Sequence, residues 1–152
     1  MATSHAPSVA DRRFLLLLLD DQDRLMLCGG CCDGWTVPQA LLAAGSDFKD
    51  GATQYLAERF HIENPRFGSL YGVHETRESD CWEHDQRTVS HVFIVRISIE
   101  ESDSFQATSP SHTRWGISEL KTRHRDISPE GVTLLISGYV EGWLPDGPIS
   151  LY

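Results

Sequence analysis

The residues with the clearest chemical potential lie in one short stretch, residues 35–62. Within it, Tyr55, Glu58 and Arg59 are spaced so that a helix would place all three on one face. A carboxylate there could bind a hard cation such as Mg2+, and a guanidinium could bind phosphate through paired N–H donors. This stretch is therefore the first candidate site. The alternative interpretation is that Glu58 and Arg59 form the solvated side of an amphipathic helix.

A helix over residues 48–60 would position this group. Ser46 and Asp47 offer N-cap oxygens immediately before it. Ala52, Leu56 and Phe60 recur at four-residue spacing and form an apolar face. We expect the helix to dock on a hydrophobic core through that face and to leave its polar side chains free.

The stretch resembles a Nudix box, the loop-helix-loop motif of the Nudix (MutT-like) hydrolase superfamily. The family pattern GX5EX7REUXEEXGU usually follows W-x-x-P, which Trp35 and Pro38 match. Aligned without gaps, the pattern spans residues 40–62. Its R-E and E-E pairs then fall on Gln54, Tyr55, Glu58 and Arg59, and its last glycine falls on His61. The box is therefore strongly degenerate, because most of its carboxylates are missing.

The resemblance implies an α/β fold, a Nudix-type α/β/α sandwich with a mixed β-sheet. In the family, carboxylates on the box helix hold Mg2+ or Mn2+ against a diphosphate. Here Glu58 is the one metal ligand that remains on that face, and a single carboxylate is a poor cage for Mg2+. Arg59 would repel a metal but could bind phosphate in its place. The sequence leaves both a divalent metal cofactor and the absence of one open.

Further candidates lie outside the box. His74 ends a predicted strand that in the family lies beside the box helix, and it suits acid–base chemistry near neutral pH. Trp35 and Trp82 could stack on a ligand ring, with Gln54 and Arg59 as polar ligand-binding groups. The alternatives are a partly solvated histidine at a strand end and tryptophans that pack in the core.

The cysteines point to no clear site. Cys28, Cys31 and Cys32 are close in sequence, and Cys81 is remote. A structural zinc would need further ligands at suitable spacing, and the remaining candidates are scattered. Free thiols fit best, although an even count leaves disulfides open. A thiol here could touch a ligand or simply fill space.

Composition indicates a single globular domain. The chain has 152 residues and 40% apolar residues, which predicts one domain over residues 13–152 after a flexible tail at 1–12. A net charge of -9 argues against nucleic acid or an anionic membrane surface as a partner. The apolar run at 14–19 is too short to span a membrane. We expect a cytoplasmic protein with a small-molecule ligand, such as a nucleotide or diphosphate, and leave a homodimer open.

The remaining elements follow from pattern. Uninterrupted leucines at 13–20 predict a strand buried on both faces, which a turn joins to a second strand at 24–28. Later strands are expected at 66–76 and 89–100, with loops at 75–87 and 102–112. A strand and a short helix are expected at 114–120. The last helix is expected at 128–143, with Trp143 on its apolar side, and a short tail follows it.

Three functions are compatible with these residues. The first is a divergent Nudix hydrolase-like enzyme that acts on a diphosphate-linked or related small metabolite with weak or altered metal dependence. The second is a Nudix-fold enzyme repurposed for metal-independent acid–base or transfer chemistry through Glu58, Tyr55, His74 or a cysteine. The third is a non-catalytic ligand-binding or interaction module.

Overall fold

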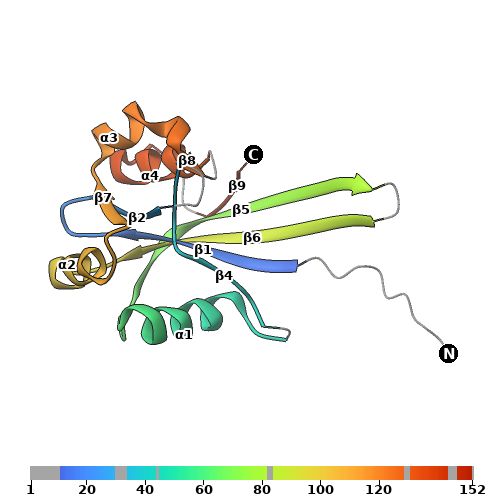
Figure 1. Cartoon of the computed structure of the whole chain (residues 1–152), viewed down its shortest axis with the longest axis horizontal. Coiled ribbons are helices and arrows are strands. Elements are labelled where there is room, and N and C mark those ends of the chain that lie inside the picture. The colour runs from blue at the N-terminus through green and yellow to red at the C-terminus, as the bar shows by residue number, and fades with distance from the viewer. Residues whose placement is uncertain are drawn as a thin grey trace.

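The protein forms one mixed β-sheet with helices on both faces (Figure 1), as the sequence predicted. The computed structural model describes residues 11–29, 34–43, 45–81, 84–128, 131–143 and 147–151. At residues 11, 69–81, 84–89 and 147–151 it describes the backbone alone. Its strands are β1 (Asp11–Leu19), β2 (Leu25–Gly29), β3 (Trp35–Thr36), β4 (Gln39–Leu41), β5 (Arg66–Cys81), β6 (His84–Arg96), β7 (His112–Trp115), β8 (Ile127–Ser128) and β9 (Gly147–Leu151). Its helices are α1 (Phe48–Phe60), α2 (Ile99–Thr108), α3 (Ile117–Thr122), the 3-10 turn η1 (His124–Asp126) and α4 (Gly131–Glu141).

Strand β1 is the centre of this sheet. The strand order is β8-β3-β2-β1-β6-β5-β9, with β4 also paired to β1 and β7 to β2. Along its whole length β1 pairs in parallel with β6. On its other edge it pairs antiparallel with β2 at one end, where Leu19 faces Leu25, and with β4 at the other, where Arg13 faces Leu41. The predicted hairpin of the first two strands is therefore confirmed.

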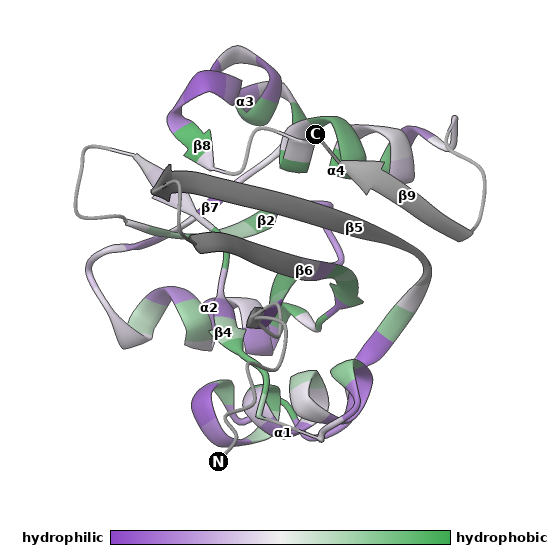
Figure 2. Ribbon diagram, turned by 90° about the vertical axis from the view of Figure 1, so that its right-hand side faces the viewer, coloured by the Kyte–Doolittle hydropathy of each residue, from purple (hydrophilic) through white to green (hydrophobic). Residues whose placement is uncertain are grey.

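Strand β1 is buried on both faces, which also confirms the prediction from its leucines. Leu15, Leu17 and Leu19 join a core cluster with residues of α3 and α4. The alternate residues of β1 join a second cluster with residues of α1 and α2: Phe14, Leu16 and Leu18. Because successive side chains of a strand point to opposite faces, one strand anchors both helical layers. Figure 2 shows α3 and α4 on one side of the sheet and α1 and α2 on the other.

The turn after β1 is organised by a buried carboxylate, Asp20, whose side chain is fully shielded from solvent. Its Oδ1 accepts hydrogen bonds from the backbone N–H groups of Gln22 and Arg24 at 2.9 and 3.0 Å. Its Oδ2 accepts from Arg24 Nε at 2.9 Å and from Ser102 Oγ of α2 at 2.8 Å. Burial alone would raise the pKa of this carboxyl, but these hydrogen bonds and the Arg24 charge together lower it.

Two segments predicted as loops are regular structure. The loop prediction for 75–87 is wrong, because β5 runs to Cys81 and pairs with β6 from Thr76 opposite Thr88 to Cys81 opposite His84. Strand pairing uses backbone groups, so a charged composition does not prevent it. The loop prediction for 102–112 is also wrong, and the strand expected over 89–100 ends at Arg96.

Helix α2 replaces that second loop. Ser98 Oγ accepts from Glu101 N at 3.1 Å, and Glu101 Oε1 accepts from Ser98 N at 2.8 Å, which is a reciprocal capping box. Ser102 and Phe105, three residues apart, are the buried side of the helix. This signature lies inside the segment that was assigned to a strand end and a loop.

The C-terminal prediction needs two corrections. Residues 147–151 are not a free tail but strand β9, which pairs in parallel with β5. Trp143 was predicted on the apolar side of the last helix, but it lies beyond the end of α4 at Glu141 and is 51% exposed.

The strand and short helix predicted at 114–120 are confirmed as β7 and α3. Among the described residues, no helix combines the length and apolar character needed to span a membrane.

Replacing Asp20 with Asn should destabilise the protein by about 2–4 kcal/mol, because an amide brings donors where four donors already converge. The lowered pKa of Asp20 means that its stabilisation is complete above its ordinary value of 3.8 and is lost as the pH falls through the lower, folded-state value. Urea unfolding of the wild type at several pH values should show this loss, and Asp20→Asn should remove that part of the pH dependence.

Asp21→Asn is the matched control, since the Asp21 side chain is 56% exposed and forms a long, exposed ion pair with Arg66 at 3.8 Å. It should change the free energy of unfolding by less than about 0.5 kcal/mol. Equal losses for the two variants would contradict the assigned role of Asp20.

Candidate functional site

Helix α1 has the bounds that the sequence predicted, residues 48–60. Its N-cap is Asp47, whose carboxylate accepts from the backbone N–H groups of Lys49 and Asp50 at 3.2 and 3.3 Å. Ala52 and Leu56 are fully buried against the sheet. The side chains on the other side of α1 are therefore held at the surface in a fixed orientation.

The C-terminal end of α1 supports the alignment with the Nudix box. His61 adopts φ 58° and ψ 31°, the left-handed conformation that favours glycine, and its N–H bonds to Leu56 O. This is the position at which the family pattern has its last glycine. Gly45, at the start of the loop before α1, has φ 80°. The backbone of the motif is thus kept where one of its glycines is not.

The polar side of α1 brings together four of the predicted site residues. Gln54 Nε2 donates to Glu58 Oε1 at 2.9 Å, so the remaining carboxylate already has one partner. The Arg59 guanidinium lies 5.9 Å from the centre of the Tyr55 ring. That ring packs edge-on against Phe14 at 5.4 Å, which holds Tyr55 in place. Glu58 and Arg59 are exposed, whereas Tyr55 is half-buried.

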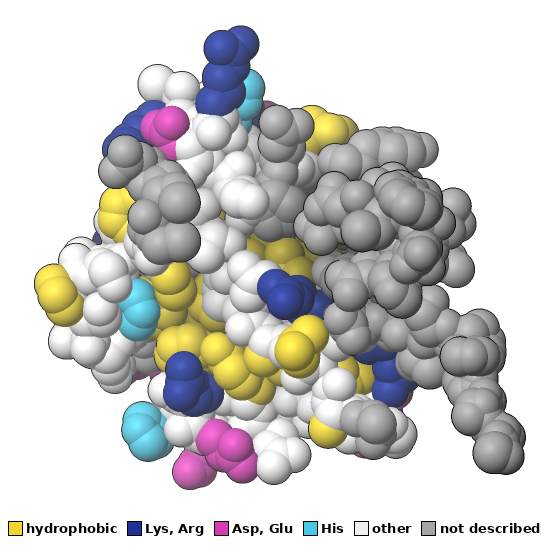
Figure 3. All heavy atoms as spheres, turned by 45° about the vertical axis from the view of Figure 1, so that its right-hand side comes forward, with side chains coloured by type: hydrophobic (Ala, Val, Ile, Leu, Met, Phe, Trp, Pro, Cys, Tyr) yellow, Lys and Arg dark blue, Asp and Glu magenta, His cyan; other side chains and the backbone are white. Residues whose placement is uncertain are grey.

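These side chains border a pocket of about 420 Å³. Tyr55, Glu58 and Arg59 line it from α1. Its opposite wall comes from other elements: Cys28 of β2, Pro38, Thr108 of α2 and His112 of β7. A smaller hollow of about 180 Å³ adjoins it and is lined in part by Gln54, Tyr55 and Glu58. On the face drawn in Figure 3, hydrophobic side chains gather in a hollow that basic, acidic and histidine side chains border.

His112 lines this candidate pocket and was not among the residues that the sequence predicted for it. Its ring stacks on Phe105 with centroids 4.1 Å apart, and its Nδ1 lies 2.8 Å from Phe105 O and 3.1 Å from Thr108 Oγ1. Thr108 Oγ1 itself donates to Phe105 O. A carbonyl oxygen only accepts, so Nδ1 must carry the proton, and Nε2 of the neutral ring keeps a lone pair. The residue lay in a predicted loop, and recognition of the α2 capping box would have drawn attention to it.

Cys28 lies in the pocket wall, but it is a poor nucleophile. Burial raises the pKa of its thiol to about 11. The thiolate is the reactive form of cysteine, and it is scarce near neutral pH at that value. Cys28 therefore contributes packing to the pocket, and chemistry through this thiol is not favoured.

Among the other predicted site residues, Trp35 is the one whose side chain the structure describes, and it does not line this pocket. Trp35 packs edge-on against Trp115 at 5.6 Å beside the core cluster under α3 and α4. His74 lies within β5, where its backbone is opposite Ser90 on one side and Leu151 on the other, and its side chain is outside the described part. Trp82, like Cys31 and Cys32, falls outside the described residues.

The donor set beside α1 does not fit a divalent metal cage. Mg2+ and Mn2+ require several oxygen ligands, chiefly carboxylates. On this face Glu58 is one carboxylate, shares a hydrogen bond with Gln54 and has the cation Arg59 next to it. Within the described ranges, no three His, Cys, Asp or Glu side chains are grouped so that they could hold a metal ion. The Arg59 guanidinium, in contrast, is a group that can bind an anion directly.

No protein-family model and no curated protein sequence matches this chain. Solved structures do match it. A C. elegans Ap4A hydrolase superposes with a TM-score of 0.62 at 12% identity, over 88% of this chain and 99% of the other. A mutT/nudix family protein from Listeria innocua gives 0.60 at 10% identity, over 88% and 96%. The E. coli dihydroneopterin triphosphate pyrophosphohydrolase gives 0.59 at 10% identity, over 89% and 99%.

The chain has a Nudix fold. At these identities the similarity establishes the architecture, and the residues of the site must be judged on their own chemistry. The Nudix fold agrees with the box alignment at the C-terminal end of α1, where His61 adopts positive φ at the position of the last glycine of the pattern. It does not restore the missing carboxylates.

Replacing His61 with Gly should stabilise the protein by about 0.5–1 kcal/mol. The change removes the strain of an L-residue in the left-handed conformation, and the greater conformational entropy of glycine in the unfolded chain offsets part of that gain. Urea unfolding measures the difference. Ser109→Gly at the C-cap of α2 is the matched control, because φ there is -154°, and it should give no gain. An equal gain at both positions would mean that the conformation of His61 is not the cause.

Proposed function

We propose that this protein is a divergent Nudix hydrolase-like protein that acts on a diphosphate-linked small metabolite in the pocket beside α1. In this proposal the Arg59 guanidinium binds the phosphate in place of a metal held by carboxylates, and the neutral His112 ring accepts a proton from the attacking water. The observation that carries the proposal is the convergence of Tyr55, Glu58, Arg59 and His112 on one pocket of about 420 Å³.

Binding would rest on donors that already border the pocket. Arg59 is exposed, and a guanidinium offers paired N–H donors in a geometry that matches two phosphate oxygens. The hydroxyl of Tyr55 can donate a further hydrogen bond. The chain as a whole carries a charge of -9, so a local cation is needed for an anionic ligand to bind.

Hydrolysis would use the lone pair of His112 Nε2. A water molecule gives a proton to Nε2 while its oxygen attacks phosphorus, and the bridging P–O bond breaks. The leaving phosphate departs as an anion with the bond's electron pair, and Arg59 stabilises the charge that develops. Glu58, which Gln54 holds by a hydrogen bond, can accept from the attacking water or from a ligand hydroxyl.

A non-catalytic binding module is the second candidate. The observation in its favour is that Glu58, the carboxylate that lines the pocket, is already paired with Gln54 and that the Cys28 thiol is unreactive. Both candidates share the same anion-binding pocket, so binding and turnover must be measured separately.

The direct test is calorimetric titration with ADP and with pyrophosphate in excess EDTA, followed by phosphate release from a panel of nucleoside diphosphate derivatives. Arg59→Ala should weaken binding at least tenfold, which corresponds to about 1.5–3 kcal/mol for hydrogen bonds to a charged group. Arg125→Ala, which removes another exposed arginine from η1, is the matched control and should bind normally. Binding that appears only with Mg2+, or that survives in Arg59→Ala, would refute the proposal.

The same panel separates a hydrolase from a binder. His112→Asn should lower kcat by at least a hundredfold and leave the dissociation constant nearly unchanged, since only the proton-accepting step is lost. Thermal unfolding must confirm that the variant is folded, because the ring also stacks on Phe105. If the wild type binds pyrophosphate but turns over no substrate in the panel, the binding module is the correct candidate.

A further inference from the structure

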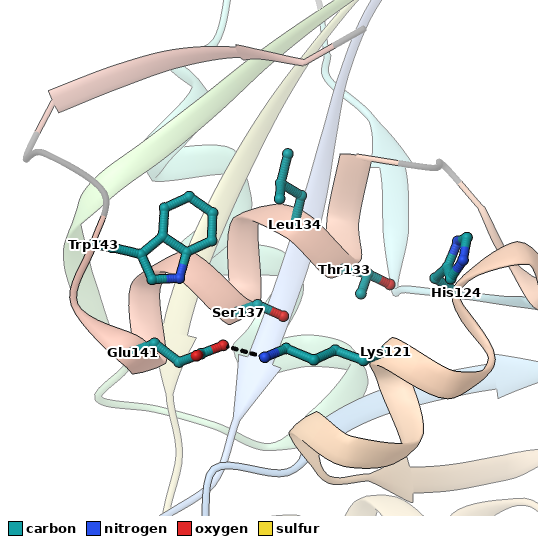
Figure 4. Close-up of a pocket in the computed structure, with 7 residues that line it drawn as sticks. All are labelled: Lys121, His124, Thr133, Leu134, Ser137, Glu141 and Trp143. Carbon is teal, nitrogen blue, oxygen red and sulfur yellow. Dashed lines mark ion pairs between the residues drawn. The ribbon is translucent and has the colours of Figure 1, made fainter.

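A second pocket, of about 330 Å³, lies between α4 and the segment formed by α3 and η1. These helices cover the face of the sheet opposite to α1 (Figure 2). Thr133 and Ser137 line one wall from α4, and Lys121 and His124 project from the other side, as Figure 4 shows. The volume is within the range typical of small-ligand sites.

Two residues in the wall of this pocket carry buried hydroxyls without partners among the described residues. Thr133 is 8% exposed and Ser137 is 3% exposed. Neither Oγ has a hydrogen-bond partner in the part of the chain that the structure describes. The two residues are one helical turn apart, so their hydroxyls lie on the same side of α4 (Figure 4). A buried unpaired hydroxyl is unfavourable, so a ligand that pairs with both would recover that free energy.

The charged groups at this pocket cancel each other. Lys121 Nζ lies 2.6 Å from Glu141 Oε1, and both side chains are about half exposed, at 53% and 41%. Such a pair offers donors and acceptors close together without a net charge. It therefore suits an uncharged ligand with several hydrogen-bonding groups better than an anion or a cation.

An apolar surface completes the pocket. Trp143 and Leu134 are among the few large hydrophobic side chains in the described residues that are strongly exposed, at 51% and 62%. Both line this pocket. The flat indole can cover an apolar ring face while its N–H remains available for a hydrogen bond.

We propose that this pocket binds a small uncharged polyhydroxylated ring compound, of the sugar or cyclitol class. Ligand hydroxyls both donate and accept, and they would pair with Thr133, Ser137 and the Lys121–Glu141 pair. The C–H face of the ring would pack on Trp143. This site is separate from the pocket beside α1, and the proposal does not depend on the function proposed for that pocket.

The test is calorimetric titration of the full chain with glucose, ribose and myo-inositol, each in turn. At least one of them should bind saturably with one site. Ser137→Ala and Thr133→Val should each weaken that binding at least tenfold. Ser104→Ala, which removes an exposed hydroxyl from α2, is the matched control and should bind as the wild type does.

Thermal unfolding of the same variants guards against a purely structural effect. Because the hydroxyls are unpaired, Ser137→Ala and Thr133→Val should unfold at the wild-type temperature or above it. The proposal is wrong if none of the three compounds binds, if Ser137→Ala binds as tightly as the wild type, or if these variants unfold at lower temperature. It is also wrong if light scattering shows a dimer that Trp143→Ser converts to a monomer, since the pocket would then be a subunit interface.

Discussion

Burial of β1 on both faces is the constraint on which the rest of the structure depends. Its odd-numbered leucines need a helical layer on one side, and Phe14, Leu16 and Leu18 need another on the opposite side. A strand of this kind cannot lie at the edge of a sheet or face water. The parallel pairing with β6 and the two antiparallel partners, β2 and β4, follow from its central position.

The same constraint explains why the backbone of the box-like segment resembles the Nudix motif although its exposed side chains do not. Helix α1 is held by Ala52 and Leu56 beneath it and by its caps at Asp47 and His61. The exposed side chains at 58 and 59 contribute little to that docking. Their chemical type can therefore change without loss of the fold. The direct contact between Arg59 and phosphate that we propose therefore requires no change in how α1 packs on the sheet.

The parts of the fold that could be predicted are those whose signals are local. The leucines of β1 and the caps and four-residue spacing of α1 were sufficient to place both elements. Helix α2 was missed because only Ser102 and Phe105 mark its buried side, and its start depends on the pair Ser98 and Glu101. The strands predicted at 66–76 and 89–100 correspond to β5 and β6, but their extension through the charged residues between them was missed, because backbone pairing leaves no apolar signature in the sequence.

The site was predicted on one wall only. Gln54, Tyr55, Glu58 and Arg59 share a helix, so their spacing was enough to group them. The other wall joins β2, α2 and β7, which no local pattern brings together, and so His112 was found only in three dimensions. Trp35 shows the limit of residue type as a signal, since an aromatic side chain alone does not distinguish a ligand platform from a residue packed against the core.

The central claim is that the pocket beside α1 binds phosphate through the Arg59 guanidinium and not through a bound divalent metal. Anomalous diffraction from crystals soaked with Mn2+ and pyrophosphate tests it most directly, because it locates the metal and the anion together. We predict pyrophosphate density in contact with Arg59 and no manganese peak at Glu58. A manganese ion coordinated by Glu58 and bridging to the pyrophosphate would contradict the account.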